Sequence, residues 1–523
     1  MKRYISKLAI AAVAVTAASC TGAYEDINSN PYEPGDLTGD DYALGSQLNN
    51  IAGCVMSADV NTLQFTDALL GGTLGGYFSD ANAGFTESFA RYNPKNDWSR
   101  VFLNSDRIIP TLYANLGQVE TICQSTGNPV PMAVSTVIKV AAMSRVTDTY
   151  GPIPYSAIGT GDLAIPYDSQ EEVYNQFFDE LNEAIDVLYE NRGIPFSKNN
   201  DYVYYGDVTK WIKFANSLKL RLAMRISFVK PAQAKQMAEE AVAGGVIESN
   251  DENATWKYFT SVTNPLYTAV NYNNNGSVTG GDTHAAADII CYMNGYNDPR
   301  REAYFLPSVW EGIEFCGLRR GWETFDKTWG FNFSGVNVKA TDPLIWMTAS
   351  EVSFLRAEGA AVHGWNMGGT AQEFYNNGIR LSFDQWGVSG ADSYLADNTS
   401  MASPYTDPSE KNPWSGSLST ITIRWDESAS TETKLERIIT QKWIALYYNG
   451  NEAWAELRRT GYPRLIPVAY NGSGGIVDSN VGPQRMPYPQ EEYTNNAVNI
   501  TQAVNTLLGG PDNQATKVWW ARH

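Results

Sequence analysis

Aromatic residues lie beside amide and charged residues in three segments that are rich in polar residues, 77–98, 267–282 and 310–331. Such side chains can bind a sugar, because an exposed aromatic ring stacks on the C–H face of the sugar while amides and charges bond its hydroxyls. The rings that we expect to stack on a ligand are Tyr77, Trp98, Trp310, Trp322 and Trp329. The alternative for any one of these rings is packing within its loop.

Catalytic and metal-binding patterns are weak by comparison. The chain has three histidines and no HExxH pattern, so a zinc enzyme or a Ser-His-Asp enzyme would have to be built from His284 or His363. We expect both histidines to be structural. A glycoside hydrolase needs two carboxylates about 5–10 Å apart, and 57 acidic residues provide such a pair by chance. The carboxylates therefore give no signal for catalysis.

A run of amides at Asn271 to Asn275, followed by Gly276, could suggest a calcium loop. Calcium takes about six to eight oxygen ligands, often from bidentate carboxylates, and this run supplies no carboxylate. A solvated loop is favoured. We predict neither a metal nor a cofactor.

The N-terminus has the pattern of a lipoprotein signal. Basic residues precede the apolar run 8–18, and small residues stand directly before Cys20. Residues 1–19 are predicted to be a cleaved signal peptide, with Cys20 carrying the acyl chains that anchor the protein stably. An ordinary secretory signal with a chance cysteine is the alternative. Residues 20–40 are polar and acidic and contain two prolines, which predicts a tether.

Composition excludes several classes of protein. The net charge of −19 lacks the basic footprint of a nucleic-acid binder. No apolar run of 18 or more residues follows the signal, so no transmembrane helix is expected.

The remaining cysteines, Cys54, Cys123, Cys291 and Cys316, have no CxxC spacing. Sequence leaves open three disulfide pairings or free buried thiols.

Helical periodicity dominates residues 41–523, which we expect to form a single domain. The clearest helix has a capping box, Ser169 with Glu172, and one apolar stripe. The predicted helices are 97–116, 131–149, 169–190, 207–228, 231–244, 348–363, 370–386, 432–448 and 451–459. Adjacent pairs indicate a mainly α, tetratricopeptide-like scaffold, and a generic helical bundle is the alternative.

Long insertions without helical periodicity separate the predicted pairs. They are 71–96, 256–346 and 387–430, and the tail 462–523 is similar. Their aromatic content argues against disorder. We therefore expect a folded, loop-rich layer on the helical scaffold, where binding residues usually lie.

Four stretches resemble the SusD/RagB family of nutrient-binding outer-membrane lipoproteins. They are VTDTYGPIPYSAI (146–158), NGYNDPRREAYF (294–305), WMTASEVSFLRAEGAAVHGW (346–365) and RIITQKWIALYYNGNEAWAELRRTGYPRL (437–465). The four stretches occur in the same order as in the family, the Cys20 signal is also typical of it, and the resemblance spans nearly the whole chain. We interpret the motif residues Arg458 and Arg459 as structural, since forked guanidinium groups can lock helix ends. The same holds for the turn at Gly151.

This resemblance implies a lid over a SusC-like TonB-dependent barrel, without enzymatic activity. The protein would capture oligosaccharides, or in some relatives peptides, and pass them to the barrel. Some family members bind calcium, which nothing in this sequence requires. Acidic residues at Glu25 and Asp26 resemble a surface-export signal and point to the outer face of the outer membrane. A surface glycoside hydrolase, or a scaffold that binds only the barrel, remains as an alternative. The sequence does not name the ligand.

Overall fold

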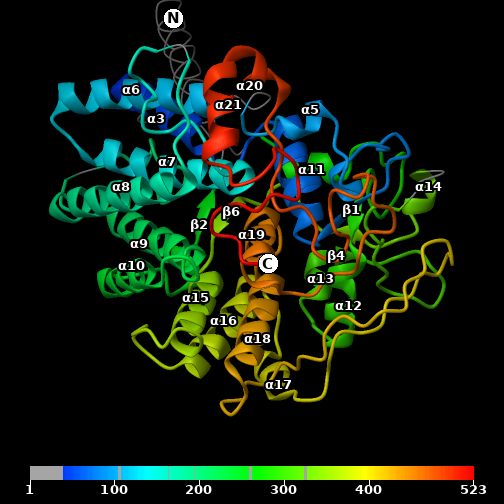
Figure 1. Cartoon of the computed structure of the whole chain (residues 1–523). Coiled ribbons are helices and arrows are strands. Elements are labelled where there is room, and N and C mark those ends of the chain that lie inside the picture. Colours follow the sequence, from blue (N-terminus) through cyan, green and yellow to red (C-terminus); the bar gives the residue numbers. More distant parts are fainter. Residues whose placement is uncertain (1–38, 104–107, 163, 195, 258–261, 323–326) are drawn as a thin grey trace, which may run out of the picture.

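A computed structural model describes residues 39–103, 108–162, 164–194, 196–257, 262–322 and 327–523 of the chain (Figure 1). The predicted signal peptide, the lipid site Cys20 and nearly all of the tether lie outside the described residues.

Pairs of neighbouring helices build one half of the molecule (Figure 1). The pairs are α7 (Val130–Tyr150) with α8 (Gln170–Glu190), α9 (Val208–Arg225) with α10 (Pro231–Gly244), α15 (Ala349–Ala361) with α16 (Ala371–Gln385), and α18 (Thr431–Ala445) with α19 (Gly450–Thr460). Two further helices, α3 (Gly39–Ala52) and α6 (Ile108–Thr126), pack on α7. The predicted tetratricopeptide-like architecture is confirmed.

Local signals fix where most of these helices begin. The capping box of Ser169 and Glu172 is present at the start of α8, and Thr370 and Glu373 form another at α16. The Asp207 side chain accepts hydrogen bonds from two backbone N–H groups of α9. Gly151 ends α7 with a φ of +87°, a conformation that glycine adopts without strain.

One expectation about the helices is wrong, and one helix begins without a complete capping box. The helix predicted at 97–116 begins instead at Ile108 and runs to Thr126, with Pro110 in its first turn, where proline is tolerated. The Thr348 side chain caps α15, but the carboxylate of Glu351 binds Arg221 at 2.7 Å and does not complete a capping box. Pairing with a buried arginine therefore takes precedence over capping at this helix.

Helix α7 is long and apolar enough to cross a membrane, but its surroundings are those of a core helix. It is the one helix in the described part of the chain that meets this test, and 78% of its apolar window is buried. The helices α3, α6 and α8 pack against it. Its apolar surface is thus covered by protein.

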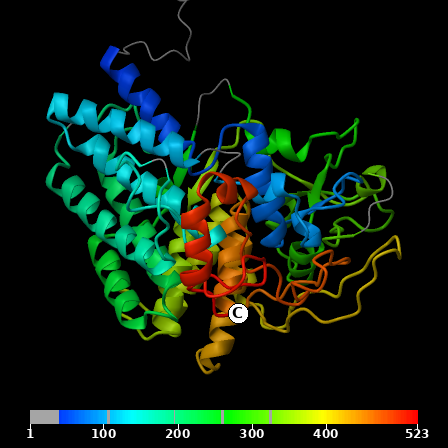
Figure 2. The same ribbon diagram turned by 45° about the horizontal axis from the view of Figure 1, so that its top comes forward.

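The other half of the molecule is the loop-rich layer, which lies on the same side in both views (Figures 1 and 2). The strands of the protein are short and pair in twos. In this layer β1 (Phe78–Asp80) pairs with β3 (Thr283–Ala285), and β4 (Phe305–Leu306) pairs with β5 (Gly335–Val336). The third pair, β2 (Ala254–Trp256) with β6 (Leu344–Met347), lies against α9 in the helical half. All three pairs are antiparallel. They join segments that are distant in the sequence.

The remaining helices are short and lie in this layer, in the tail or, for η3 (Asn250–Glu252) and α17 (Ala391–Ala396), beside α15 and α16. The others are α4 (Val60–Leu63), η1 (Gln64–Gly72), η2 (Phe89–Arg91), α5 (Asn96–Ser99), α11 (Pro265–Val270), α12 (Ala287–Gly295), α13 (Arg301–Tyr304), α14 (Lys327–Gly330), α20 (Gln490–Asn495) and α21 (Ala497–Thr506). The expectation that the segment 256–346 and the tail contain no helices is therefore wrong. Seven of the nine residues of α12 are buried, so this helix has no amphipathic period to detect.

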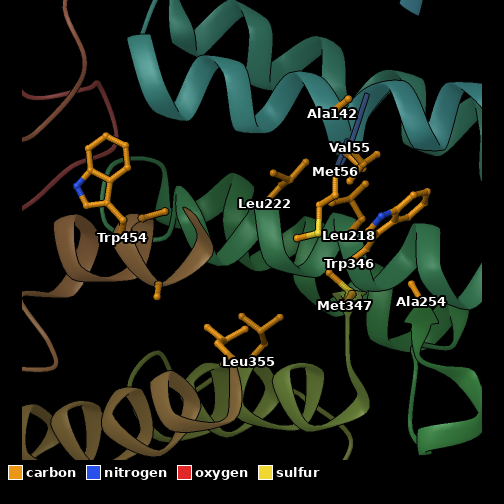
Figure 3. Packing of buried hydrophobic residues seen from close by; sticks show 14 of the residues in the cluster. Val55, Met56, Ala142, Leu218, Leu222, Ala254, Trp346, Met347, Leu355 and Trp454 are labelled. Carbon is orange, nitrogen blue, oxygen red and sulfur yellow. The ribbon is translucent and has the colours of Figure 1, made fainter. Parts of the chain in front are cut away.

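A continuous apolar core runs through the helical half and includes residues of the loop-rich layer such as Phe89 and Phe305; Figure 3 shows part of this core. Figure 3 shows side chains from different elements meeting in it, among them Met56, Leu222, Trp346 and Trp454. A second, smaller core lies in the loop-rich layer and comprises Ala81, Cys316, Leu318, Trp322 and Phe333. The four cysteines that the structure describes are buried free thiols.

Buried ion pairs join the helices at the centre of the fold. The network comprises Arg221, Arg225, Lys442, Arg459, Asp148, Glu351, Glu358, Glu452 and Glu456. Beside it, Arg458 donates to the backbone carbonyls of Asp148 and Gln484 at 2.6 and 3.0 Å. The structural role predicted for Arg458 and Arg459 is confirmed.

Candidate functional site

Three of the five rings expected to face a ligand are inside the protein. Tyr77, Trp98 and Trp322 are only 0%, 8% and 1% exposed. The Tyr77 hydroxyl donates to the carbonyl of Trp443 at 2.5 Å, and the Trp322 indole N–H donates to the carbonyl of Asp80 at 3.1 Å. The expectation that these rings are open to solvent is wrong, because the loops fold onto one another and onto α18.

The other two predicted rings, Trp310 and Trp329, are half-buried and lie together. Their ring centroids are 6.5 Å apart in an edge-to-face arrangement, and Trp329 also packs on Trp322 and Phe333. We call these four rings the indole cluster. Trp310 and Trp329 thus pack against neighbouring rings while each side chain stays half-buried. Ligand stacking by either ring stays a prediction.

A surface segment connects the indole cluster to a hollow in the same layer. The Lys411 ammonium lies 5.1 Å from the centre of the Trp329 ring. Next along the chain, the carbonyls of Asn412 and Pro413 accept hydrogen bonds from the guanidinium of Arg319. Arg319 donates also to the carbonyl of Pro467 at 2.9 Å, so it ties two loops together.

The hollow has a volume of about 330 Å³, within the range of about 300–1,000 Å³ that is usual for ligand sites. We call it the Trp414 hollow. It is lined by Leu74, Tyr92, Arg320, Trp414, Ser417, Trp454, Leu457, Gly461, Pro463, Arg464, Leu465, Ile466, Pro467, Ser479, Asn480, Val481, Gly482 and Pro483. The lining thus combines aromatic rings, hydroxyl and amide groups and two arginines, and it contains no carboxylate.

Trp414 is the half-buried ring of this hollow, and Gly416 fixes its position. A Cβ at Gly416 would lie 2.3 Å from Cζ2 of Trp414, so the glycine backbone packs directly on the indole. Trp414 was not among the predicted residues. Its signal in the sequence is a tryptophan flanked by proline, serine and glycine within the 387–430 insertion.

The two arginines of the hollow differ in their surroundings. Arg320 is buried, and its Nε donates to the Asp288 carboxylate at 2.8 Å. Asp288 also accepts from the N–H of Ile466, which fixes the loop above it. The Arg464 side chain is 61% exposed, and the Glu436 carboxylate comes no closer to it than 4.0 Å. The exposed Arg464 side chain, whose residue lines the hollow, therefore has N–H donors that make no protein hydrogen bond.

The histidines are placed in structural surroundings. His284 is buried in β3, and burial lowers its pKa to about 4, so the ring is neutral at physiological pH. The His363 ring stacks on Trp365 with a centroid distance of 4.5 Å. In the residues that the structure describes, no three His, Cys, Asp or Glu side chains group as metal ligands. In the run Asn271 to Asn275, which could suggest a calcium loop, the side-chain amide of Asn273 donates a hydrogen bond to the Asp282 carboxylate at 2.8 Å.

The sequence model of the family described as SusD and RagB outer membrane lipoprotein matches residues 26–521 of the chain. The chain belongs to the SusD-like family. Its fold is shared with a SusD homologue from Bacteroides uniformis at 60% identity and a TM-score of 0.90, with coverage of 92% of this chain and 100% of that one. No curated protein sequence matches the chain.

Two further SusD homologues of known structure are more distant. One, from Bacteroides thetaiotaomicron, is 41% identical with a TM-score of 0.84 and covers 92% of this chain and 99% of its own. The other is a chitin-binding SusD homologue from Flavobacterium johnsoniae, 39% identical with a TM-score of 0.83, and covers 91% of this chain and 98% of its own. The fold of this SusD-like chain is thus that of solved relatives along most of its length.

Two other cavities of this SusD-like protein fit a saccharide less well. A cavity of about 250 Å³ beside α3 and α4 has the rings of Phe102 and Trp256, but both are buried. A groove of about 760 Å³ at α15 and α16 is strongly polar, and the guanidinium of Arg356 covers its one ring, Phe374, at 4.0 Å. Neither offers an open ring face. The Trp414 hollow and the neighbouring indole cluster therefore form the candidate site.

Proposed function

We propose that this protein captures oligosaccharides at the bacterial cell surface and delivers them to a SusC-like TonB-dependent barrel in the outer membrane. Acyl chains on Cys20 anchor it, and the loop-rich layer binds the ligand. The protein acts by binding alone and carries out no reaction on the sugar.

The single observation that carries the proposal is the half-buried Trp414 ring on the wall of the 330 Å³ hollow. The ring packs on the backbone of Gly416, so the Trp414 side chain loses little conformational freedom when a sugar stacks on it. Ser417 and Asn480, which line the same hollow, supply the hydroxyl and amide groups that bond sugar hydroxyls. Membership of the SusD-like family and a chitin-binding relative support this interpretation.

A glycan array with the soluble form, residues 21–523, tests the proposal. Binding to at least one class of oligosaccharide is expected, and Trp414→Ala is expected to weaken it about tenfold or more. Stacking on an aromatic side chain contributes about 1–3 kcal/mol in nucleic-acid complexes, and we expect a similar size here. Tyr189→Ala is the matched control, because Tyr189 is an exposed ring on α8 in the helical half.

Three outcomes would contradict the proposal. Binding of peptides in place of glycans, through the same ring, would make the protein a peptide receptor. Release of sugar that stops when one carboxylate is replaced would make it a glycoside hydrolase. A flat response to every glycan and peptide, with an intact complex between the protein and a barrel after membrane solubilisation, would make it a scaffold.

A further inference from the structure

Two arginines of the loop-rich layer, Arg91 and Arg319, are held differently from those that pair with carboxylates in the helical half. In the helical half, guanidinium groups bind carboxylates, as Arg225 binds Glu452 and Arg459 binds Glu358. In the loop-rich layer, Arg91 and Arg319 donate to backbone carbonyls. Among the described residues, neither has a carboxylate within 4.0 Å. Their positive charges are thus not cancelled by an ion pair.

Arg319 places such a charge beside the Trp414 hollow. Four backbone carbonyls accept its hydrogen bonds, those of Asn412, Pro413, Pro467 and Val468. These carbonyls belong to the two loops that form the wall of the hollow. Since most of its N–H groups are occupied, Arg319 acts on a ligand through its field and not by direct contact.

Arg464 can make direct contact with a ligand. Arg464 lines the hollow, and its guanidinium makes no hydrogen bond to any described residue. Its Nε lies 4.0 Å from the Glu436 carboxylate, which is a long ion pair. A planar guanidinium binds a carboxylate or a sulfate through two parallel hydrogen bonds. Exposed charges of this kind interact weakly across solvent, but a ligand that fills the hollow would exclude water from the contact.

Acidic side chains near the hollow are already engaged. Asp288 binds Arg320 and the backbone of Ile466. Asp407, on the segment next to Arg319, accepts hydrogen bonds from Ser409 and the Asn412 N–H. Asp478 accepts from the Asn480 N–H and is not among the residues that line the hollow. In a protein of net charge −19, a lining that contains two arginines and no carboxylate is a local exception. Arg320 is paired with Asp288, and the Glu436 carboxylate lies 4.0 Å from Arg464.

We propose that the Trp414 hollow takes an acidic saccharide, whose carboxylate or sulfate group binds Arg464 while a sugar ring stacks on Trp414. This inference rests on the proposed function and adds the substrate class. Arg464 and Trp414 line the same cavity, so one ligand can contact both. A neutral saccharide would use the ring alone.

The test compares matched ligands by calorimetry with the soluble form, residues 21–523. One pair is tetragalacturonate and its methyl ester, which separates the carboxylate from the rest of the sugar. The other pair is a κ-carrageenan tetrasaccharide and its desulfated form. A glycan array with neutral and acidic members, including chitin oligosaccharides, extends the comparison. At least one acidic ligand is expected to bind about tenfold or more tightly than its neutral partner.

Variants assign the effect to Arg464. Arg464→Gln is expected to remove the preference for the acidic ligand, and Arg464→Lys to restore part of it. Raising the salt concentration from 50 to 500 mM should weaken only the acidic ligand, because the interaction is between charges. Arg192→Gln is the control, since Arg192 is an exposed arginine at the end of α8. The Arg464 side chain packs on little, so these variants are expected to fold.

The outcomes separate the two proposals. Equal affinity for acidic and neutral ligands, with an effect of Trp414→Ala and none of Arg464→Gln, overturns the acidic ligand and leaves glycan capture intact. Absence of any binding that depends on Trp414 overturns both. An acidic preference that survives Arg464→Gln also overturns the inference, because the charge would then be recognised elsewhere.

Discussion

Arg459 of α19 and Glu358 of α15 share two parallel hydrogen bonds, with Nη1–Oε1 and Nη2–Oε2 distances of 2.6 and 2.7 Å. Both side chains are fully buried, and Arg459 also binds Glu456 on its own helix. Burial alone would raise the pKa of Glu358, but the charge of Arg459 holds that pKa below its usual value. The pair joins the last helix of the scaffold to the middle of the fold.

Removing this buried charge is expected to destabilise the protein strongly. Glu358→Gln leaves the Arg459 charge inside the protein with part of its compensation gone, and breaking a buried pair costs about 3–5 kcal/mol. The midpoint of urea unfolding measures the loss. The control is Asp392→Asn, which breaks the exposed pair with Arg380, where Asp392 is 84% exposed, and is expected to cost less than about 1 kcal/mol. Equal effects of the two variants would contradict the prediction.

Gly416 is expected to control ligand binding without controlling stability. In Gly416→Ala the new Cβ would stand 2.3 Å from the Trp414 ring, so the indole must move. Binding of the array-selected glycan should fall about as far as in Trp414→Ala, while thermal unfolding changes little. Gly193→Ala is the matched control, since a Cβ there meets nothing within 4 Å. Unchanged affinity in Gly416→Ala would show that the ring position is not needed.

Local patterns explain which parts of the fold were predictable. The capping box of Ser169 and Glu172 and the apolar stripe of α8 involve neighbours within one or two turns, so the sequence displays them directly. Helix α12 has no such stripe because it is buried on all sides. The family resemblance then supplied the arrangement of the pairs, which periodicity alone did not distinguish from a bundle.

The site was predictable only in part, because burial in the loops depends on distant partners. The Tyr77 hydroxyl binds a carbonyl 366 positions away, and the Trp322 indole binds one 242 positions away. Neither contact leaves a trace near the tyrosine or the tryptophan in the sequence. Trp310 and Trp329 look alike at the level of sequence, yet they remain half-buried. Trp414 stood in a recognised insertion and needed the structure to place it beside the hollow.

Lipidation of Cys20 is expected to decide where the protein resides. Cys20→Ser removes the thiol that carries the diacylglycerol, so the protein should leave the membrane fraction and appear as a soluble species. Metabolic labelling with palmitate, followed by membrane fractionation, measures both effects. Cys123→Ser is the control, because its thiol lies within the folded domain. Retention of label and membrane association in Cys20→Ser would contradict the lipoprotein signal.

The four other thiols are expected to be reduced and unreactive in the folded protein. Burial raises the pKa of Cys54 and of Cys316 to about 12, and the thiolate is the reactive form. Ellman's reagent should therefore detect almost no reactive thiol in the native soluble form and all four thiols after unfolding in guanidinium. A reductant should leave the unfolding temperature unchanged. Detection of two or fewer thiols after unfolding without reductant would indicate a disulfide.

Asp80 is expected to make stability depend on pH. Burial, together with the nearby charge of Asp282, raises the pKa of Asp80 from its ordinary value of 3.8 to about 7, against opposing effects of Ser88 and Arg91. The folded protein then binds a proton that the unfolded chain has released. The contribution of Asp80 to stability is thus fully present below pH 3.8 and is lost as the pH rises towards 7.

Asp80→Asn mimics the protonated carboxyl and tests this dependence. The variant should match the parent protein near pH 4 and be more stable near pH 8, where an ionised Asp80 costs on the order of 4 kcal/mol. Urea unfolding at both pH values gives the difference between variant and parent, so the titration of other groups cancels. Asp392→Asn, at an exposed carboxylate, should show the same small difference at both. A stabilisation by Asp80→Asn that is equal at pH 4 and pH 8 would show that Asp80 is ionised in the fold throughout.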